Sequence, residues 1–438
     1  MSLYTVLLLL FIVTISSVFF GASVRHVLLG GKTLGIFGDA MLYIAEFPSN
    51  VQDVLEMGPS EQYISQTRFR NLDGFKKDGK LPAGVLADEG YLLLSSYNAN
   101  KEQATVQLIQ INTQKTLHEW VPDIDLLNEL NILSEKYSAD FTTTSNFRLM
   151  HPLPVNGTRL VFNNSSGLYG MNLCGENDMF VDGTFHHSNE LDHEGNIWVP
   201  SVKYPHSFEK LIEFRDDAIT KISPSGDVLF KKSVAEILVE NGYQGLFATS
   251  NDDDPIHIND IQPALSDSNF WRKGDLLMSL RNPSTVLLYR PSTNKVLWLK
   301  TGPWMNQHDI SFVDDHTISV FGNNVIDNRG TIRLFYGQNS VYFYDFKTNE
   351  VSEPYREIMK EMEVKTITEG LGTPLSGGDL FIDESNEGRI LRVSADEVKW
   401  EFVRRIDEES LAMSSWSRYL TPQAAEPMIE QLRSNSCK

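Results

Sequence analysis

The sequence predicts an all-β protein, a six-bladed β-propeller with an N-terminal transmembrane helix and short helical insertions. Two observations lead to the propeller. From about residue 88, short apolar runs recur between turns rich in Asn, Asp, Gly and Ser, a pattern typical of many-stranded antiparallel proteins. One hairpin plan also recurs, with an alternating strand, a short polar turn and a second strand that often carries Trp or Phe. The matching segments are LIQINTQKTLHEW (108–120), ITKISPSGDVLFK (219–231), LLYRPSTNKVLWL (287–299), YFYDFKTNEVSEP (342–354) and ILRVSADEVKWEF (390–402).

The spacing of these hairpins gives the blade count. The gap between the first two is wide enough to hold one further unit, near LVFNNSSGLYGMN (160–172). Six such units, each a small sheet of about four strands, predict a propeller. A pair of β-sandwiches whose hairpins resemble each other by chance is the alternative interpretation.

The N-terminus carries an uncharged apolar run at residues 3–22, LYTVLLLLFIVTISSVFFGA, long enough for a helix to cross a bilayer. No Lys or Arg precedes the run and no clear A-x-A cleavage site follows, so an uncleaved anchor is favoured over a cleaved signal peptide. Arg25 and Lys32 would retain the following domain in the cytoplasm by the positive-inside rule, which is weak for large domains.

We therefore expect four parts. They are an anchor or signal segment at 1–24, a lead-in segment at 25–87, the β-propeller at 88–405 and a helical tail at 406–438. Five stretches predict helices: VQDVLEM in the lead-in, SFEKLIEFRDD, SVAEILVENG and PYREIMKEME between strands, and AAEPMIEQLRSNS in the tail.

The composition excludes several classes of function. A net charge of -20 argues against a nucleic-acid partner and requires a locally positive pocket for any anionic substrate. Cys174 and Cys437 lie in unlike contexts, so the sequence indicates neither a disulfide framework nor a thiolate metal site. A bridge between these two cysteines is possible, but no feature of the sequence supports it. It contains no P-loop and no GxGxxG between a strand and a helix, so we expect no nucleotide and no bound organic cofactor.

Three segments share one layout, in which a histidine lies ahead of a short apolar strand and a turn leads to a second strand. These are His186-His187 ahead of IWVPS, His257 in IHIND ahead of DLLMSLR, and His308 in WMNQHDI ahead of SFVDDHTISVF. Equivalent blade positions of a propeller meet at its central channel, so we expect these histidines to converge. A single histidine in such a place is more simply a packing residue or a strap between blades.

Two chemistries fit a cluster of this kind. Three neutral imidazoles could bind a metal such as zinc, supported by Asp260 and Asp309. Alternatively, one histidine forms a covalent intermediate while the others and Arg281 hold an anion. The planar guanidinium of Arg281 suits the oxygens of a sulfate or phosphate group, although a salt bridge at the strand edge is its simpler interpretation.

The segments HHSNELDHEGNIW, IHIND with GDLLMSLR, and WMNQHDISFVDDHTISVFGNN resemble the aryl sulfotransferases that use phenolic sulfates instead of a nucleotide donor. The resemblance covers roughly residues 88–405. It implies a six-bladed propeller with the active site in its central funnel. It also implies transfer from a small aryl sulfate donor to a phenolic or alcohol acceptor through a transiently sulfated histidine, with no cofactor and no metal.

By motif, His308 matches the nucleophilic histidine of this family. The residues that match its substrate-binding groups are His257, Asn259, Arg281, Thr373 and one of His186 and His187, with His187 preferred. Bacterial members are commonly exported, so the resemblance implies a single-pass membrane protein, anchored through residues 3–22, with its propeller on the extracytoplasmic side.

The sequence also departs from the best-known bacterial members, because it has too few N-terminal residues for their separate β-sandwich domain and no close cysteine pair. Two other functions stay open. One is a metal-dependent propeller hydrolase or lyase that uses the same histidines, and the other is a non-catalytic propeller that binds a partner. The sequence indicates neither the physiological donor and acceptor nor the oligomeric state.

Overall fold

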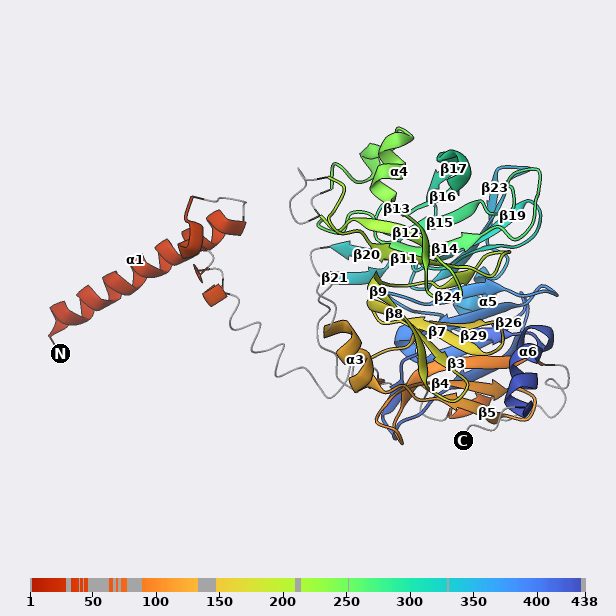
Figure 1. Cartoon of the computed structure of the whole chain (residues 1–438). Coiled ribbons are helices and arrows are strands. Elements are labelled where there is room, and N and C mark those ends of the chain that lie inside the picture. The colour runs from red at the N-terminus through yellow and green to blue at the C-terminus, as the bar shows by residue number, and fades with distance from the viewer. Residues whose placement is uncertain are drawn as a thin grey trace. The chain divides into compact units, whose positions relative to one another are not determined.

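The computed structural model shows a chain of two compact units, Met1–Ser60 and Glu61–Lys438 (Figure 1). The structure describes residues 2–28, 33–38, 40–41, 43–45, 63–65, 68–69, 72–76, 89–132, 147–208, 214–250, 252–328 and 331–434. The helix expected around VQDVLEM lies outside the described residues.

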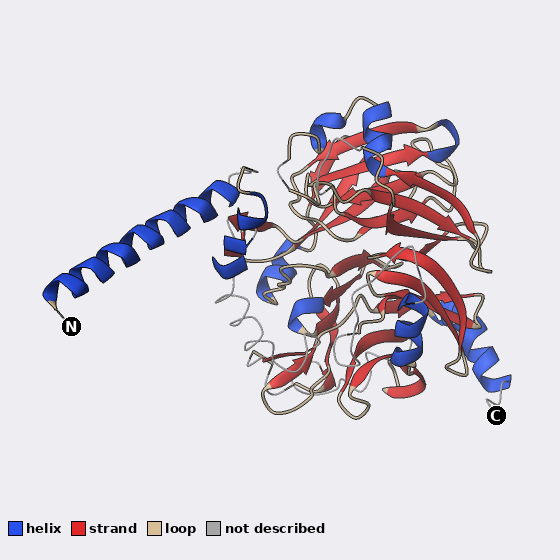
Figure 2. Ribbon diagram, turned by 60° about the vertical axis from the view of Figure 1, so that its left-hand side comes forward, coloured by secondary structure: helices blue, strands red, loops and turns tan. Residues whose placement is uncertain are grey.

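The first unit contains the helix α1 (Leu3–Leu28), the predicted apolar helix. Its segment Leu3–Val27 has a mean hydropathy of 2.5 and is not buried in the structure, and Figure 2 shows the helix as one continuous ribbon. By length and composition this segment can cross a membrane, and a signal sequence has the same properties. The helix is therefore compatible with a single-pass anchor or with a signal sequence.

The second unit is all-β and propeller-like, built from antiparallel sheets (Figure 2). Three sheets have four strands. The first comprises β29 (Arg418–Leu420), β3 (Tyr91–Asn98), β4 (Gln103–Gln110) and β5 (Lys115–Trp120). The second comprises β14 (Ile258–Pro263), β15 (Leu276–Leu280), β16 (Thr285–Arg290) and β17 (Lys295–Thr301). The third comprises β18 (Ile310–Phe312), β19 (Thr317–Gly322), β22 (Ser340–Asp345) and β23 (Glu350–Ser352).

The remaining sheets differ in size. A five-stranded sheet comprises β24 (Leu371–Pro374), β25 (Leu380–Glu384), β26 (Arg389–Val393), β27 (Val398–Val403) and β2 (Gly74–Lys76). An eight-stranded sheet comprises β6 (Met150–Val155), β7 (Arg159–Asn163), β8 (Ser166–Asn172), β9 (Asn177–Phe185), β10 (Glu190–Leu191), β11 (Ile197–Val202), β12 (Asp217–Ile222) and β13 (Val228–Ser233). Two-stranded sheets pair β1 (Tyr63–Ser65) with β28 (Ser410–Ala412) and β20 (Val325–Asn328) with β21 (Thr331–Leu334).

The prediction of six separate blades needs a correction. In the described part of the chain, four sheets of four or five strands stand alone as blades, not six. The strands β6 to β13 form a single eight-stranded sheet, because Phe185 at the end of β9 pairs with Ser201 of β11. That one pair joins the strands β6 to β9 to the strands β10 to β13.

The two ends of the second unit meet in one sheet. The late strand β29 pairs with the early strand β3, with Arg418 opposite Leu93 and Leu420 opposite Tyr91. This pairing covers the edge of β3 that would otherwise expose unpaired backbone groups. The first strands of neighbouring sheets also contact each other, β10 with β14, β14 with β18 and β18 with β24. The residues that begin these strands therefore lie near one another.

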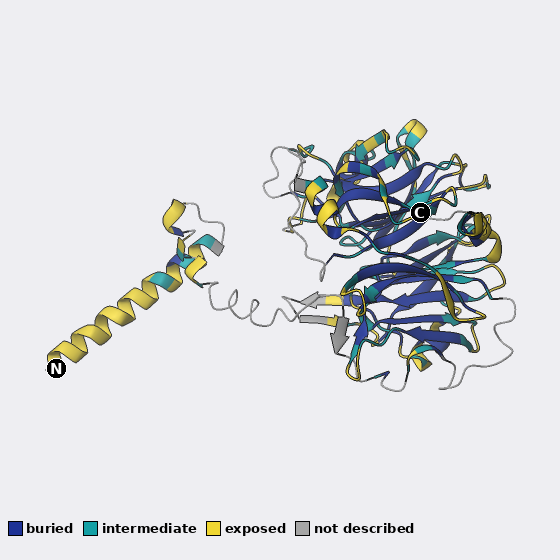
Figure 3. Ribbon diagram, turned by 60° about the horizontal axis from the view of Figure 1, so that its bottom comes forward, coloured by how far each residue is buried: buried dark blue, intermediate teal, exposed yellow. Residues whose placement is uncertain are grey.

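Burial explains the strand composition. The strand β15, with the sequence LLMSL, is buried at every position, whereas the outer strand β17 has no buried residue. Figure 3 shows the buried residues following the strands inside the second unit. Apolar side chains of adjacent sheets pack together, such as Ile219 from β12, Ile258 from β14 and Leu287 from β16. Continuous apolar runs are expected for strands that are covered on both faces.

Four described helices lie in the second unit: α3 (Ile124–Ile132), α4 (Val234–Glu240), α5 (Arg356–Glu361) and α6 (Pro422–Ser434). Helix α4 begins after Ser233, whose hydroxyl accepts a hydrogen bond from the Glu236 amide at 3.1 Å and so caps the helix N-terminus. The helices predicted at SVAEILVENG, PYREIMKEME and AAEPMIEQLRSNS are confirmed. The helix predicted at SFEKLIEFRDD is described only at its ends, and its last residue, Asp217, begins β12.

The expectation about the cysteines also needs a correction. Cys174 follows β8 and is disulfide-bonded, and Cys437 is the other cysteine of the chain. Residue 437 lies outside the described residues. The sequence contexts of the two cysteines did not indicate a bridge, because residues far apart in a chain carry no local signal of pairing.

Buried aspartates connect neighbouring blades. Asp217 accepts a hydrogen bond from the Ile258 amide at 2.8 Å, Asp260 from Ile310 at 3.0 Å, Asp309 from Gly372 at 3.0 Å and Asp383 from Ser417 at 2.8 Å. A buried backbone amide must find an acceptor, and here the preceding blade supplies it. These contacts hold the beginnings of the inner strands in place.

Candidate active site

The structure brings together the three histidines that share one sequence layout. His187 lies between β9 and β10, His257 directly precedes β14, and His308 lies two residues ahead of β18. The ring centroid of His187 is 5.0 Å from that of His257 and 6.2 Å from that of His308. Trp416 completes the group, with its ring 5.4 Å from His187 and 6.3 Å from His308.

Several residues around this cluster have a left-handed backbone conformation. Five residues have φ angles in the left-handed region: His187 at 60°, His257 at 50°, Trp416 at 55°, Glu369 at 59° and Asn306 at 48°. Such conformations cost non-glycine residues on the order of 1–3 kcal/mol each. Strained residues gather where the surrounding structure fixes side chains for a function, so the cluster is a candidate functional site.

His308 is held through both of its ring nitrogens. Its Nδ1 lies 2.7 Å from Asn323 Oδ1 and 3.2 Å from the Asn306 carbonyl oxygen, and its Nε2 accepts the Glu369 amide at 3.1 Å. This network assigns the proton to Nδ1 and the lone pair to Nε2. Burial, followed by the charge of Arg281, lowers the pKa of His308 to about 3. The imidazole is therefore neutral and able to act as a nucleophile near pH 7.

His257 has a different partner. Its Nδ1 lies 2.5 Å from Asp254 Oδ2, so this network also assigns the proton to Nδ1 and the lone pair to Nε2. The same carboxylate oxygen is 3.6 Å from Arg215 Nη1. The His257 side chain is 22% exposed, whereas His308 is only 4% exposed. His257 is therefore the more accessible of the two rings.

His186 and His187 form a pair. Their Nδ1 atoms are 2.7 Å apart, so one of them carries the shared proton. His186 is 1% exposed, and its Nε2 lies 3.4 Å from Asp217 Oδ1. Burial lowers the pKa of both histidines. His187 carries the ring that faces the cluster, and His186 supports it from behind.

Arg281 lies beside the same histidines. Its backbone amide donates to the His257 carbonyl oxygen at 2.9 Å, and its Nη1 donates to Asn282 Oδ1 at 2.7 Å. Its positive charge contributes to the lowered pKa of His308. The cluster thus combines imidazoles with a guanidinium, and this combination can hold an anion.

Asn259 and Thr373, which were expected to bind substrate, have side-chain hydrogen bonds to residues outside the histidine cluster. Asn259 Nδ2 donates to the Gln307 carbonyl oxygen at 2.9 Å, which ties β14 to the segment ahead of β18. Its Oδ1 is buried without a hydrogen-bond partner among the described residues. Thr373 Oγ1 donates to Asp309 Oδ2 at 3.2 Å, and both residues line a cavity of about 170 Å³ that none of the three clustered histidines lines.

The support expected from Asp260 and Asp309 needs a correction. Both carboxylates accept backbone amides of the next blade, and neither bonds to a clustered histidine among the described contacts. The carboxylates beside the histidines are Asp254 and Asp217. Asp309 directly follows His308, and the side chains of successive residues in an extended segment point in opposite directions.

Four residues around the site were missed from the sequence, namely Asn323, Asp254, Glu369 and Arg148. Arg148 forms a bidentate ion pair with Glu369, at 2.5 and 2.6 Å, and its Nε donates to Ser415 Oγ at 3.0 Å. This pair fixes the segment whose amide meets His308. Asp254 lies three residues ahead of His257 in DDDPIH, a proximity that could have indicated it.

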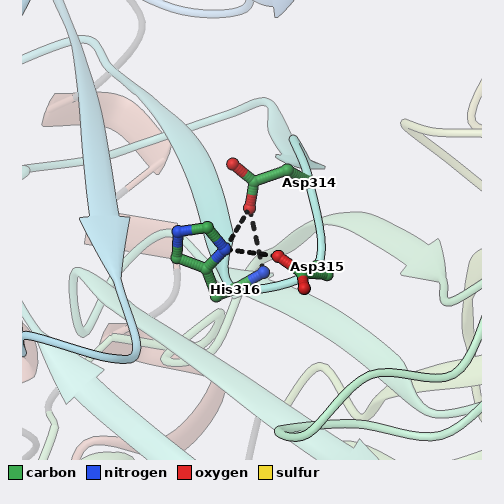
Figure 4. Close-up of side chains that lie close together, drawn as sticks. All are labelled: Asp314, Asp315 and His316. Atoms are coloured by element: carbon green, nitrogen blue, oxygen red, sulfur yellow. Dashed lines mark hydrogen bonds and ion pairs between the residues drawn. The ribbon is translucent and has the colours of Figure 1, made fainter.

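One exposed turn also gathers possible metal ligands. Asp314, Asp315 and His316, between β18 and β19, place ligand atoms within 4.8 Å of one another (Figure 4). Their contacts are those of a tight turn. Asp314 Oδ1 accepts the amides of His316 at 2.9 Å and Thr317 at 2.8 Å, and His316 Nδ1 lies 2.5 Å from Asp315 Oδ1. This group stands apart from the histidine cluster.

The fold and the site together define a class, that of propeller-like proteins with a histidine cluster beside an arginine. The chain belongs to the arylsulfotransferase (ASST) family, whose model matches residues 160–405. The matched residues include all three clustered histidines and Arg281. No curated protein sequence matches the chain.

Three solved structures show a partial similarity to the chain. A protein of unknown function from Bacteroides caccae is 13% identical, with a TM-score of 0.45 over 72% of this chain and 94% of its own. The Pan2 WD40 domain of Neurospora crassa is 10% identical, with a TM-score of 0.39 over 78% of this chain and 86% of its own. Sqt1 of Saccharomyces cerevisiae is 12% identical, with a TM-score of 0.34 over 72% of this chain and 66% of its own.

Proposed function

We propose that the protein is an aryl sulfotransferase that moves a sulfuryl group from an aryl sulfate to an acceptor hydroxyl through a sulfated His308. The observation that carries this proposal is the position of His308, a neutral imidazole with its lone pair on Nε2, in a cluster with His187 and His257. The family membership supports small aryl compounds as substrates.

In the first half-reaction, His308 Nε2 attacks the sulfur of the aryl sulfate. The sulfur–oxygen bond to the aryl group breaks, and the phenolate leaves with the electron pair. Attack requires Nε2 to leave the Glu369 amide, which then lies beside the sulfuryl oxygens. Arg281 and the freed Glu369 amide supply N–H donors to the developing charge, and preorganised donors of this kind contribute several kcal/mol to a transition state. The rings of His187 and His257 lie beside them.

Asn323 has a clear part in this step. Its Oδ1 accepts the Nδ1 proton of His308, and its Nδ2 donates to the carbonyl oxygens of Thr366 at 3.1 Å and Glu369 at 2.8 Å. The same side chain therefore orients the imidazole and holds the segment that covers it. We propose that Asn259 and Thr373 also contact the substrate. The substrate then replaces or extends the hydrogen bonds that these two side chains now donate.

The N-terminal helix and the disulfide support a proposal for the location. We propose that residues 3–22 anchor the chain by a single pass and that the propeller, at 88–405, works outside the cytoplasm. The disulfide of Cys174 supports this side of the membrane, because structural disulfides form and persist in oxidising compartments.

The proposal is tested by incubating the purified protein with p-nitrophenyl sulfate and phenol, with and without a chelator. We expect phenyl sulfate to form at the same rate in both cases. The variant His308→Asn should lose this transfer by at least about 10³-fold, because the covalent route is removed. His193→Asn, at an exposed histidine of the HHSNELDH segment, is the matched control and should keep it. Transfer that requires a metal, or that survives in His308→Asn, would contradict the proposal.

A further inference from the structure

His257 and His308 differ in the group that accepts the hydrogen bond from their Nδ1 atoms. For His308 the acceptor is the neutral amide of Asn323, whereas for His257 it is the carboxylate of Asp254. A carboxylate stabilises the imidazolium that forms when the opposite nitrogen takes a proton, and a neutral amide does so far less. The two rings are therefore prepared for different steps.

The carboxylate of Asp254 is itself held in place. Arg215 Nη1 lies 3.6 Å from Oδ2, and the backbone amide of Asp254 donates to Asp252 Oδ1 at 3.1 Å. Asn282 Nδ2 donates to the Asp254 carbonyl oxygen. Asp254 Oδ1 is buried without a hydrogen-bond partner among the described residues, so the bond of this carboxylate to His257 is its principal one.

The backbone of His257 is fixed as well. Its carbonyl oxygen accepts the Arg281 amide at 2.9 Å, and its φ of 50° holds the residue in the left-handed region. The ring then meets His187 edge to face, at an interplanar angle of 80°. The lone pair on Nε2 belongs to a ring that is fixed through Nδ1 and through its own backbone.

We propose that Asp254 is a positioning residue, which fixes His257 with Nε2 unprotonated so that His257 takes the proton of the acceptor hydroxyl. The inference rests on the proposed function and assigns a base to its second half. In that step the acceptor oxygen attacks the sulfur of sulfated His308. The oxygen–sulfur bond forms, the nitrogen–sulfur bond breaks, and its electron pair returns to His308 Nε2. The hydroxyl proton moves to His257 Nε2 and then to solvent.

This assignment predicts that only the second of the two half-reactions needs a base. In the first, a phenolate leaves from the donor and no proton has to be removed from an attacking hydroxyl. In the second, an alcohol or an un-ionised phenol attacks, so a base is needed. Loss of the Asp254 carboxylate should therefore slow the second half-reaction and leave the first one nearly unchanged. An acceptor that is already ionised should need no base.

The experiment compares the full-length wild-type protein, Asp254→Asn and Asp253→Asn. Asp253 is an exposed neighbour, so its variant makes the same chemical change outside the site. Each protein is sulfated with p-nitrophenyl sulfate and freed of donor. It is then mixed with either phenol or pentafluorophenol at neutral pH, and loss of the sulfuryl group is followed by intact mass. Phenol is almost fully protonated at this pH, with a pKa near the value of about 10 for tyrosine, whereas pentafluorophenol is ionised.

For Asp254→Asn we expect sulfation within a few-fold of wild type, transfer to phenol slowed by about 10²–10⁴-fold, and transfer to pentafluorophenol slowed by less than about 10-fold. Asp253→Asn should match wild type throughout. Equal losses in both half-reactions, or equal losses with the two acceptors, would show a merely structural role and overturn the inference. Transfer to phenol at the wild-type rate in Asp254→Asn would overturn it too. If the wild-type protein forms no sulfated intermediate, the proposed function itself is wrong.

Discussion

The burial of His308 leads to a specific expectation about pH. An ordinary histidine, with a pKa of about 6.5, is only about 3% neutral at pH 5, so a reaction that needs its lone pair would slow by about 30-fold between pH 8 and pH 5. Burial and the nearby Arg281 instead lower the pKa of His308 to about 3. At pH 5 about 99% of the molecules should then keep a neutral imidazole, and sulfation of the enzyme should slow by less than about twofold.

The assay is a rapid-quench measurement of the first turnover with p-nitrophenyl sulfate from pH 5 to pH 8. Samples are quenched into alkali so that the released p-nitrophenol is read under one condition. The first turnover reports sulfation alone, which separates His308 from any base used later. A fall of about 30-fold that follows a single pKa near 6.5 would refute the burial argument. Unchanged circular dichroism across the same range serves as the control for folding.

Two further predictions concern stability. Replacing Arg148 with Ala should lower the free energy of unfolding by about 1–3 kcal/mol in urea titrations, because the Glu369 side chain, only 16% exposed, loses its bidentate partner. Arg433→Ala, at an exposed pair, should change it by less than about 0.5 kcal/mol, and equal effects would contradict this. Burial raises the pKa of Asp309 to about 7, so between about pH 4 and pH 7 the native state binds more protons than the unfolded chain. The stability of the wild type relative to Asp309→Asn should therefore fall as pH rises through this window, by about 4 kcal/mol at most, and level off above it; a rise would contradict the assignment.

The hairpins found in the sequence show what a local pattern can reveal. The five quoted hairpins correspond to the pairs β4–β5, β12–β13, β16–β17, β22–β23 and β26–β27, which lie at or near the outer side of their sheets. The outer strand of such a pair carries exposed positions and follows a polar turn, as β17 does. The inner strands are buried along their length and carry no such exposed positions, as LLMSL of β15 illustrates. Near residues 160–172 the quoted segment is β7–β8, whereas the outer pair of that group is β8–β9.

The site residues also divide into those that a local sequence pattern reveals and those that it does not. The three histidines could be predicted because each one opens an inner strand in a repeated layout, so a single structural rule places all of them. Arg148 and Glu369, 221 residues apart, could not, because their ion pair depends on how distant segments pack. Thr373 was matched by motif, but its hydroxyl bonds to Asp309 and lines a separate cavity.

The most direct test of the account is to locate the sulfuryl group. The full-length protein is incubated with p-nitrophenyl sulfate without an acceptor, quenched and digested, and its peptides are sequenced by mass spectrometry. We predict one added SO₃ on the peptide that contains His308, located on that residue and absent from His308→Asn. A sulfuryl group on another histidine, or donor turnover with no modified peptide at all, would contradict the claim that His308 is the nucleophile.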